Sequence, residues 1–327
     1  MIHPAGFRPA WWLPGPHAQT LWPHLFRRPR RPPTRRERLE LPDGDFVDLD
    51  WTPREDGPLV AVFHGLEGSI DSSYASGVLG ALHEAGLRAV LMHFRGCSGE
   101  PNRLPRGYHS GDTGDIRHLL GVLRGRFPDT PLGAVGYSLG GNALLCTLGE
   151  DGADAPLQAA AAVSVPLVLR EAADRLKRGF SRVYGAHLLR SLKASAAARL
   201  TGRDDHPVDL AAVQASRDFW ELDDRLTAPL HGFADVHDYY ARSASRQHLG
   251  AVRVPTLVVH SADDPFLTPA VIPEPHELSD AVRFELSRAG GHVGFVSGRI
   301  PLRPRYWLDE RLVAWFSEKL RSDLPPT

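Results

Sequence analysis

The sequence predicts an α/β protein built on a mostly parallel central sheet with helices on both faces. Apolar segments of strand length recur along the chain, and segments with helical spacing of apolar residues follow them, as in 58–65 followed by 76–86. The apolar runs are continuous and do not alternate with polar residues. Strands of that kind are buried on both faces, which is typical of a parallel sheet covered by helices.

The expected elements can be placed in chain order. Strands are predicted at the apolar runs 58–65, 87–96, 131–138, 157–166, 254–264 and 282–292. Helices are predicted at 76–86, 115–127, 139–150 and around 305–321. The segment 38–51, RLELPDGDFVDLDW, predicts an antiparallel hairpin that precedes the parallel strands.

A stretch of almost ninety residues between the strands that end near 166 and begin near 254 has no strand signal. A structureless loop of that length is improbable in a globular chain, so we expect a helical insertion over one end of the sheet. The predicted organisation is therefore a core formed by 1–166 and 251–327, with a helical cap or lid at 167–250.

Composition limits the class of protein. Of the 327 residues, 42% are apolar and 24% are charged, which is enough apolar material for a large core. The formal net charge of −1 gives no reason to expect nucleic acid as a partner. No apolar run approaches the roughly 18 residues that cross a bilayer, and the proline-broken N-terminus lacks the apolar core of a secretory signal. We expect a soluble cytoplasmic protein without stable membrane insertion, in which Cys97 and Cys146 are reduced thiols.

One basic stretch stands out at 27–38, RRPRRPPTRRER, with seven arginines and three prolines. It could contact anionic lipid or another polyanion, or it could be a solvated connector that leads into the first strand of the hairpin. We expect the connector, because no amphipathic helix accompanies the charges.

The segment 134–142, AVGYSLGGN, places Ser138 between Gly136 and Gly140 at a junction of predicted strand and helix. A residue in so sharp a turn is held in strained backbone geometry, and side chains two positions away on either side would collide with their neighbours. Glycines at both positions remove those collisions. The pattern predicts an exposed, nucleophilic serine above the sheet, with the N-terminus of a helix directed toward developing negative charge.

A serine nucleophile needs a base, and the base needs an acid that orients it. In chains with this serine turn the acid follows a late strand and the histidine comes last. Asp264 is the expected acid, with Asp263 as the alternative, and His292 in a glycine-rich loop is the expected base. The 28 residues from Asp264 to His292 leave room for one helix and one strand. His260 lies inside a predicted strand and is expected to be a packed core residue.

The oxyanion of an acyl-transfer intermediate needs two hydrogen-bond donors. The backbone N–H of Leu139, directly after the serine, is one expected donor, and the N–H of Leu66 in the loop HGLEGS is the other. His64 is expected to brace that loop, and Cys97 to be a small loop residue near the pocket. No histidine or cysteine pair has the spacing of metal ligands, so we expect neither a metal nor another cofactor.

With these residues in place, the sequence resembles the α/β-hydrolase superfamily, and within it the YheT-like esterases. The likeness covers nearly the whole chain and includes FRPAWWLPGPHAQTLWP, HGLEGS, GYSLGGN, DDPF and GGHVGF, with 95–115 as its most specific element. The resemblance implies a triad of Ser138, Asp264 and His292 and carboxylic-ester hydrolysis. Eukaryotic relatives usually begin with a membrane anchor, and this chain departs from them there.

Three functions are compatible with these residues. The first is a serine esterase that acts on a small-molecule substrate with a small to medium apolar acyl chain, through an acyl-enzyme on Ser138. The second is an acyltransferase or thioesterase with the same triad, and the third is a non-catalytic binding protein on the hydrolase fold. An apolar acyl pocket under the insertion is expected from its aromatic residues, which are Phe180, Tyr184, Phe219, Trp220, Phe233, Tyr239 and Tyr240.

Overall fold

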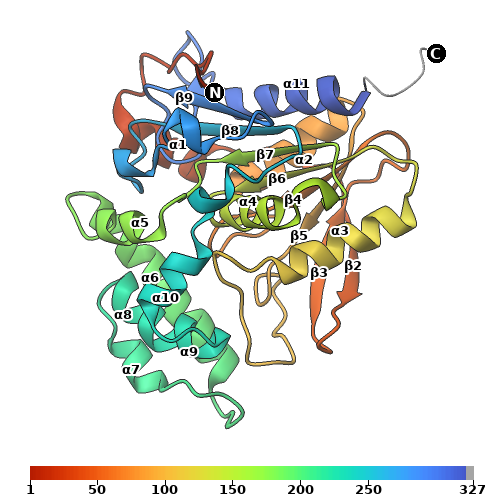
Figure 1. Cartoon of the computed structure of the whole chain (residues 1–327). Coiled ribbons are helices and arrows are strands. Elements are labelled where there is room, and N and C mark those ends of the chain that lie inside the picture. Colours follow the sequence, from red (N-terminus) through yellow and green to blue (C-terminus); the bar gives the residue numbers. More distant parts are fainter. Residues whose placement is uncertain (322–327) are drawn as a thin grey trace.

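The central element of the fold is a nine-stranded, mostly parallel sheet, seen in a computed structural model that describes residues 1–321 (Figure 1). From one edge to the other, the strands are β1 (Ile2–Pro4), β9 (Val282–Ser287), β8 (Thr256–Ser261), β7 (Ala159–Val163), β6 (Leu132–Tyr137), β4 (Leu59–Phe63), β5 (Arg88–Met92), β3 (Phe46–Trp51) and β2 (Arg35–Glu40). Neighbours pair in parallel from β1 to β5 and antiparallel from β5 to β2. The predicted fold class and the hairpin before the parallel strands are confirmed.

Helices cover both faces of the sheet. One face packs against α2 (Ser73–Glu84) and α11 (Trp307–Arg321), and the other against α3 (Gly114–Arg126) and α4 (Leu139–Asp151). Successive residues of β4 alternate between the two cores, with Val60 and Val62 on the first face and Ala61 and Phe63 on the second. All four side chains are fully buried, which explains why the strand has a continuous apolar sequence.

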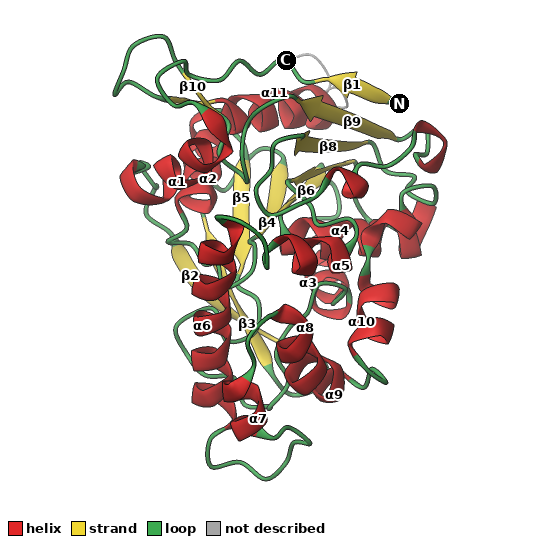
Figure 2. Cartoon of the chain, turned by 90° about the vertical axis from the view of Figure 1, so that its left-hand side faces the viewer, coloured by secondary structure: helices red, strands yellow, loops and turns green. Residues whose placement is uncertain are grey.

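The inserted segment folds into helices that lie together beyond the carboxyl ends of the strands (Figures 1 and 2). They are α5 (Leu169–Arg175), α6 (Ser181–Leu200), α7 (Leu210–Ala215), α8 (Phe219–Leu222), the π-helical turn η2 (Asp223–Thr227), α9 (Ala228–His231), α10 (Val236–Ser243) and the 3-10 turn η3 (Ser245–His248). Part of the segment has its own apolar cluster, formed around Leu189, Leu200, Val213 and Leu222.

The first 26 residues contain two elements that the sequence patterns did not predict. β1 adds an edge strand, and α1 (Gly15–Phe26) is a helix with Pro16 at its start and Pro23 inside it. Tertiary contacts hold α1 in place, since the Gln19 side chain both donates to and accepts from the backbone of Val296. Val296 belongs to β10 (Val296–Ser297), which pairs with β11 (Arg305–Tyr306).

Two local features differ from the interpretation of the sequence. Between Asp264 and β9 there are only the 3-10 turns Pro269–Val271 and Pro275–Glu277 in place of a helix, because the prolines remove backbone donors and fix the φ angles. The basic stretch 27–38 is a connector only in part, since Arg27 is buried and 35–38 belong to β2, and α1 directly precedes it. The last six residues of the predicted core range 251–327 lie outside the described residues.

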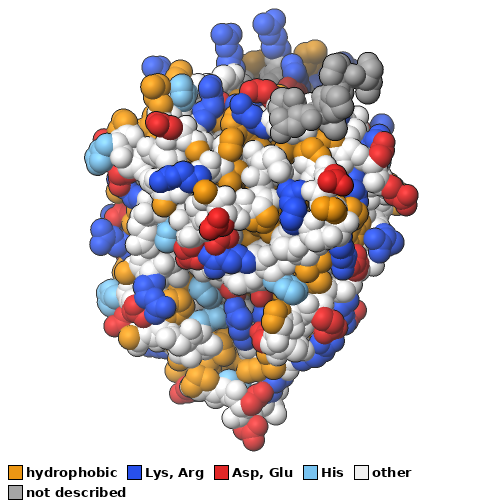
Figure 3. All heavy atoms as spheres, turned by 45° about the vertical axis from the view of Figure 1, so that its right-hand side comes forward, with side chains coloured by type: hydrophobic (Ala, Val, Ile, Leu, Met, Phe, Trp, Pro, Cys, Tyr) orange, Lys and Arg blue, Asp and Glu red, His pale blue; other side chains and the backbone are white. Residues whose placement is uncertain are grey.

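The face shown in Figure 3 carries acidic and basic side chains that are interspersed over the surface. Within residues 1–321, no helix is both long and apolar enough to cross a membrane.

Candidate active site

Ser138 occupies the turn between β6 and α4, at the carboxyl edge of the sheet. Its φ of 51° and ψ of −116° lie in a region that L-residues rarely adopt. A Cβ at Gly136 would overlap the Gly140 carbonyl, and a Cβ at Gly140 would overlap the His64 carbonyl. The two glycines are therefore required by close backbone packing around the strained serine.

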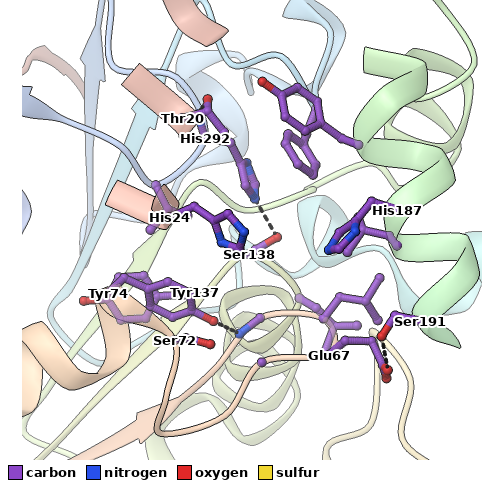
Figure 4. A pocket seen from close by; sticks show the side chains of 18 of the residues that line it. Thr20, His24, Glu67, Ser72, Tyr74, Tyr137, Ser138, His187, Ser191 and His292 are labelled. Atoms are coloured by element: carbon purple, nitrogen blue, oxygen red, sulfur yellow. Dashed lines mark hydrogen bonds between the residues drawn. The ribbon is translucent and has the colours of Figure 1, made fainter. Parts of the chain in front are cut away.

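The structure brings Ser138, His292 and Asp264 into one hydrogen-bonded chain. The distance from His292 Nε2 to Ser138 Oγ is 3.1 Å, and that from His292 Nδ1 to Asp264 Oδ2 is 2.8 Å. The Asp264 side chain is 1% exposed and that of His292 12% exposed, so the acid is shielded while the imidazole remains reachable. Figure 4 shows the His292 ring directed at Ser138, with the hydrogen bond between them drawn as a dashed line.

Asp263, the alternative acid, has different partners. Its Oδ1 accepts a hydrogen bond of 3.0 Å from the Gly291 N–H and another from the Ser261 hydroxyl. The carboxylate of Asp263 therefore fixes the backbone just before His292, and Asp264 is the aspartate that contacts the imidazole.

Two residues that the sequence analysis did not single out, Phe266 and Thr20, hold His292 in place. Its ring stacks on Phe266 at a centroid distance of 4.1 Å, and Tyr184 stacks on the other side of Phe266 at 4.9 Å. The His292 N–H donates to Thr20 Oγ at 2.9 Å. Phe266 and Thr20 belong to the segments DDPF and PHAQT, but nothing in either segment indicates a contact so distant in sequence.

The two expected oxyanion donors lie beside Ser138. Leu139 is the first residue of α4, so its N–H has no acceptor within the helix. The N–H of Leu66 likewise meets no acceptor in the described part of the chain. Both leucines line the same pocket as Ser138.

His64 braces the loop that carries Leu66. Its Nε2 accepts from the Phe94 N–H at 3.0 Å, and its Nδ1 lies 2.7 Å from the Gly65 carbonyl, to which it donates as the neutral tautomer. Complete burial lowers the pKa of His64 to about 3. The imidazole is thus neutral at physiological pH and serves as a fixed bridge between two backbone segments.

Glu67, directly after Leu66, is a further residue that the sequence patterns did not reveal. Its φ of 53° is unusual for a residue other than glycine. Its N–H donates to the Tyr108 hydroxyl at 2.7 Å, and its Oε2 accepts from Ser191 Oγ at 2.9 Å and Ser195 Oγ at 2.6 Å. The carboxylate thereby ties this loop to α6, as Figure 4 shows for Ser191.

A cavity of about 1290 Å³ opens next to Ser138. Its apolar lining comes largely from the inserted helices and includes Leu169, Ala172, Leu176, Phe180, Tyr184, Phe219, Tyr239 and Tyr240. Trp220 and Phe233, also expected in the pocket, do not line it: Trp220 packs within the insertion, and Phe233 packs on Tyr239 and His109. Trp220 contacts Tyr240 at a centroid distance of 4.9 Å and donates to Asp174.

Other residues considered in the sequence do not take part in the hydrogen-bonded chain. His260 is buried in β8, and burial lowers its pKa to about 4. Burial raises the pKa of the Cys97 thiol to about 12, so this cysteine is not a thiolate at neutral pH. Cys97 and Cys146 are both free. Among the described residues, no group of three or more His, Cys, Asp or Glu side chains is arranged to hold a metal ion.

The sheet order, the strained serine turn and the Ser–His–Asp hydrogen bonds together define an α/β hydrolase. The family described as alpha/beta hydrolase fold matches residues 58–298, so the chain belongs to this family of hydrolase enzymes.

Individual relatives agree with this membership. The chain is 45% identical over 311 residues to an Escherichia coli protein named "Putative esterase YheT", covering 94% of this chain and 91% of that protein. It is 28% identical to the Mus musculus protein named "Phospholipase ABHD3", covering 84% of this chain and 70% of that one. A solved esterase from Pyrococcus furiosus shares the fold at a TM-score of 0.60 and 15% identity, with 98% of both chains covered.

Proposed function

We propose that the protein is a serine carboxylic-ester hydrolase in which Ser138, His292 and Asp264 form the catalytic triad. The observation that carries the proposal is the hydrogen-bonded chain from Ser138 Oγ through His292 to the buried Asp264, beside a large, partly apolar cavity. The esterase name of the 45% identical relative supports the same reaction class.

The reaction follows from this geometry. His292 Nε2 takes the proton from Ser138 Oγ as the oxygen attacks the ester carbonyl, and the resulting oxyanion accepts hydrogen bonds from the N–H groups of Leu66 and Leu139. Collapse of this intermediate breaks the bond to the alcohol, which leaves with the proton that His292 returns. Water then attacks the acyl-enzyme by the same steps in reverse. Asp264 holds the imidazole in the required tautomer and stabilises its charged form.

The substrate class follows from the cavity. Apolar side chains of the inserted helices line the cavity next to the serine, and we infer that 167–250 acts as a cap over a small to medium acyl chain. Acyl transfer and thioester cleavage use the same residues and differ only in the acceptor or the leaving atom.

The proposal is tested by measuring turnover of p-nitrophenyl esters of graded acyl length, with product analysis in the presence of added alcohol or thiol. Release of free acid from oxygen esters at every acceptor concentration supports the hydrolase. Accumulation of a new ester or thioester would indicate a transferase, and cleavage restricted to thioesters would indicate a thioesterase. No turnover of any ester would contradict the proposal.

Glu67 is expected to position the oxyanion loop. Because Glu67→Ala removes the bonds to Ser191 and Ser195, we expect kcat to fall about tenfold to a hundredfold, with KM little changed. The matched variant is Glu67→Gly, since glycine adopts the φ of 53° without strain but cannot accept those bonds. The measurement is the steady-state kcat and KM of the parent and of both variants on the same ester. A Glu67→Gly variant with the kcat of the parent would show that the carboxylate has no positioning role.

Phe219 is expected to contact the acyl chain, whereas its neighbour Trp220 only stabilises the insertion. Phe219→Ala should lower kcat/KM for an octanoate ester at least tenfold more than for an acetate ester, since each methylene in an apolar pocket contributes about 1–3 kcal/mol of discrimination. Trp220→Ala should change all acyl lengths alike and lower the melting temperature. The measurement is turnover of acetate, butyrate and octanoate esters alongside thermal unfolding, and equal effects of the two substitutions on length preference would refute the distinction.

A further inference from the structure

The cavity beside Ser138 has a basic side that the ester chemistry does not use. Its lining includes Arg27, Arg28, Arg30 and Arg31, which follow α1 directly. The segment 27–31, called the mouth segment below, lies against the start of α2, since Arg31 donates to the Ile70 carbonyl. Its side of the pocket is therefore polar, in contrast to the side formed by the inserted helices.

Two arginines anchor the mouth segment. Arg27 is buried, forms an ion pair with Asp309 and lies over the Tyr306 ring at 4.0 Å. At the other end, Arg31 pairs with Asp71 at 2.9 Å. Pro29 between them restricts the backbone further. The two charges that hold the segment are thus already neutralised by carboxylates.

The two remaining arginines have no carboxylate partner. Arg28 is exposed and donates only to the Arg27 carbonyl, at 3.2 Å. Arg30 is exposed, and no ion pair or side-chain hydrogen bond of its guanidinium is found among residues 1–321. Between fixed ends, the mouth segment presents two unpaired guanidinium groups.

The acids that line the same cavity are occupied elsewhere. Asp71 is paired with Arg31. The Glu67 carboxylate accepts hydrogen bonds from Ser191 and Ser195. The Asp223 carboxylate accepts from Tyr240 at 2.7 Å and from Thr227 at 2.7 Å. The mouth segment therefore carries positive charge that no lining acid neutralises through a direct contact.

Polar groups connect the mouth segment to the serine. Figure 4 shows His24 and Ser72 on one side of Ser138 and His187 and Ser191 on the other. The rings of His24 and His187 lie edge to face at a centroid distance of 6.5 Å. An ester whose carbonyl lies at Ser138 sends its acyl and alcohol parts in opposite directions, so an acyl chain under the inserted helices directs the alcohol part toward the mouth segment.

We propose that Arg28 and Arg30 form an anion subsite for a negatively charged group, phosphate or carboxylate, on the alcohol part of the ester substrate. This inference rests on the proposed ester hydrolysis, and it adds that the alcohol released in that reaction is negatively charged. Guanidinium groups suit both anions, because their N–H fork matches two oxygens at once. Placement at the solvent edge also lets the released anionic alcohol leave without crossing the apolar part of the pocket.

The test uses soluble butanoyl esters in matched pairs, so that no lipid surface is present. One pair is monobutanoylglycerol and its 3-phosphate, and the other is the butanoyl esters of propan-1-ol and of 3-hydroxypropanoate. At low salt, kcat/KM should be about tenfold to a hundredfold higher for the anionic member of at least one pair, and the preferred pair identifies the anion. Added salt should reduce that ratio.

The double variant Arg28→Gln/Arg30→Gln should bring the ratio of anionic to neutral ester close to one. Arg35→Gln is the matched control, because Arg35 belongs to the same basic stretch but lies on β2 with its side chain 71% exposed. A parent enzyme without preference for either anion, or a preference that survives the double substitution, would overturn the proposal. So would arginine-dependent binding to phosphatidylglycerol vesicles without any preference among soluble esters, which would make the segment a lipid contact. Failure of the parent enzyme to hydrolyse either member of either pair would instead contradict the proposed ester hydrolysis.

Discussion

Replacement of Ser138 by alanine is expected to lower ester turnover by about three to six powers of ten, to the level left by binding and the oxyanion donors alone. The Ser138 hydroxyl lies 3.1 Å from His292 Nε2, so alanine leaves the imidazole without a proton donor. The strained backbone at φ 51° is set by the surrounding glycines and is tolerated equally by alanine.

The measurement is kcat on p-nitrophenyl butyrate, together with thermal unfolding as the control for folding. An unchanged melting temperature with turnover near background identifies a chemical role for the hydroxyl. Turnover above a few per cent of the parent would mean that another group is the nucleophile. A large fall in melting temperature would mean that Ser138 serves packing.

Replacement of Asp264 by asparagine should lower kcat by about ten-thousand-fold. The carboxylate accepts the Nδ1 proton of His292 at 2.8 Å, and an amide in its place favours the wrong tautomer and removes the support for the charged imidazole. The neighbouring substitution Asp263→Asn is the matched control. The Asp263→Asn side chain still has one oxygen that can accept from the Gly291 N–H, so we expect kcat to fall by no more than about tenfold.

Kinetics of the two variants on the same ester decide between the aspartates. The order of the two losses in kcat is informative, because both residues are acidic, adjacent and close to His292. A larger loss for Asp263→Asn than for Asp264→Asn would assign the orienting role to Asp263 and contradict the assignment from geometry.

The core of the fold could be predicted from the sequence because buried parallel strands have a signature of their own. Continuous apolar runs located β4, β5, β6 and β7, and the hairpin turn located β2 and β3. The serine turn could be predicted for a similar reason, since the requirement for Gly136 and Gly140 is local and steric. These features are encoded within a few residues of where they occur.

Features that depend on distant contacts could not be predicted. α1 contains two prolines and no strong helical signal, and it is held by Gln19 against a strand almost three hundred residues away. Glu67 resembles any loop glutamate until α6 brings Ser191 and Ser195 to it. The different roles of Phe219, which lines the cavity, and Trp220, which packs within the insertion, could not be predicted either. Adjacent residues on a short helix point to different surroundings.

Covalent labelling by a fluorophosphonate, followed by mass spectrometry of the intact protein and its peptides, is the direct test of Ser138 as the activated nucleophile. Attack of an activated serine on phosphorus expels fluoride and leaves a stable adduct on the oxygen, without any need to know the natural ester. We expect one adduct per chain, located at Ser138, that is absent from Ser138→Ala and forms far more slowly in Asp264→Asn. An unlabelled parent protein, or an adduct on another residue, would contradict it.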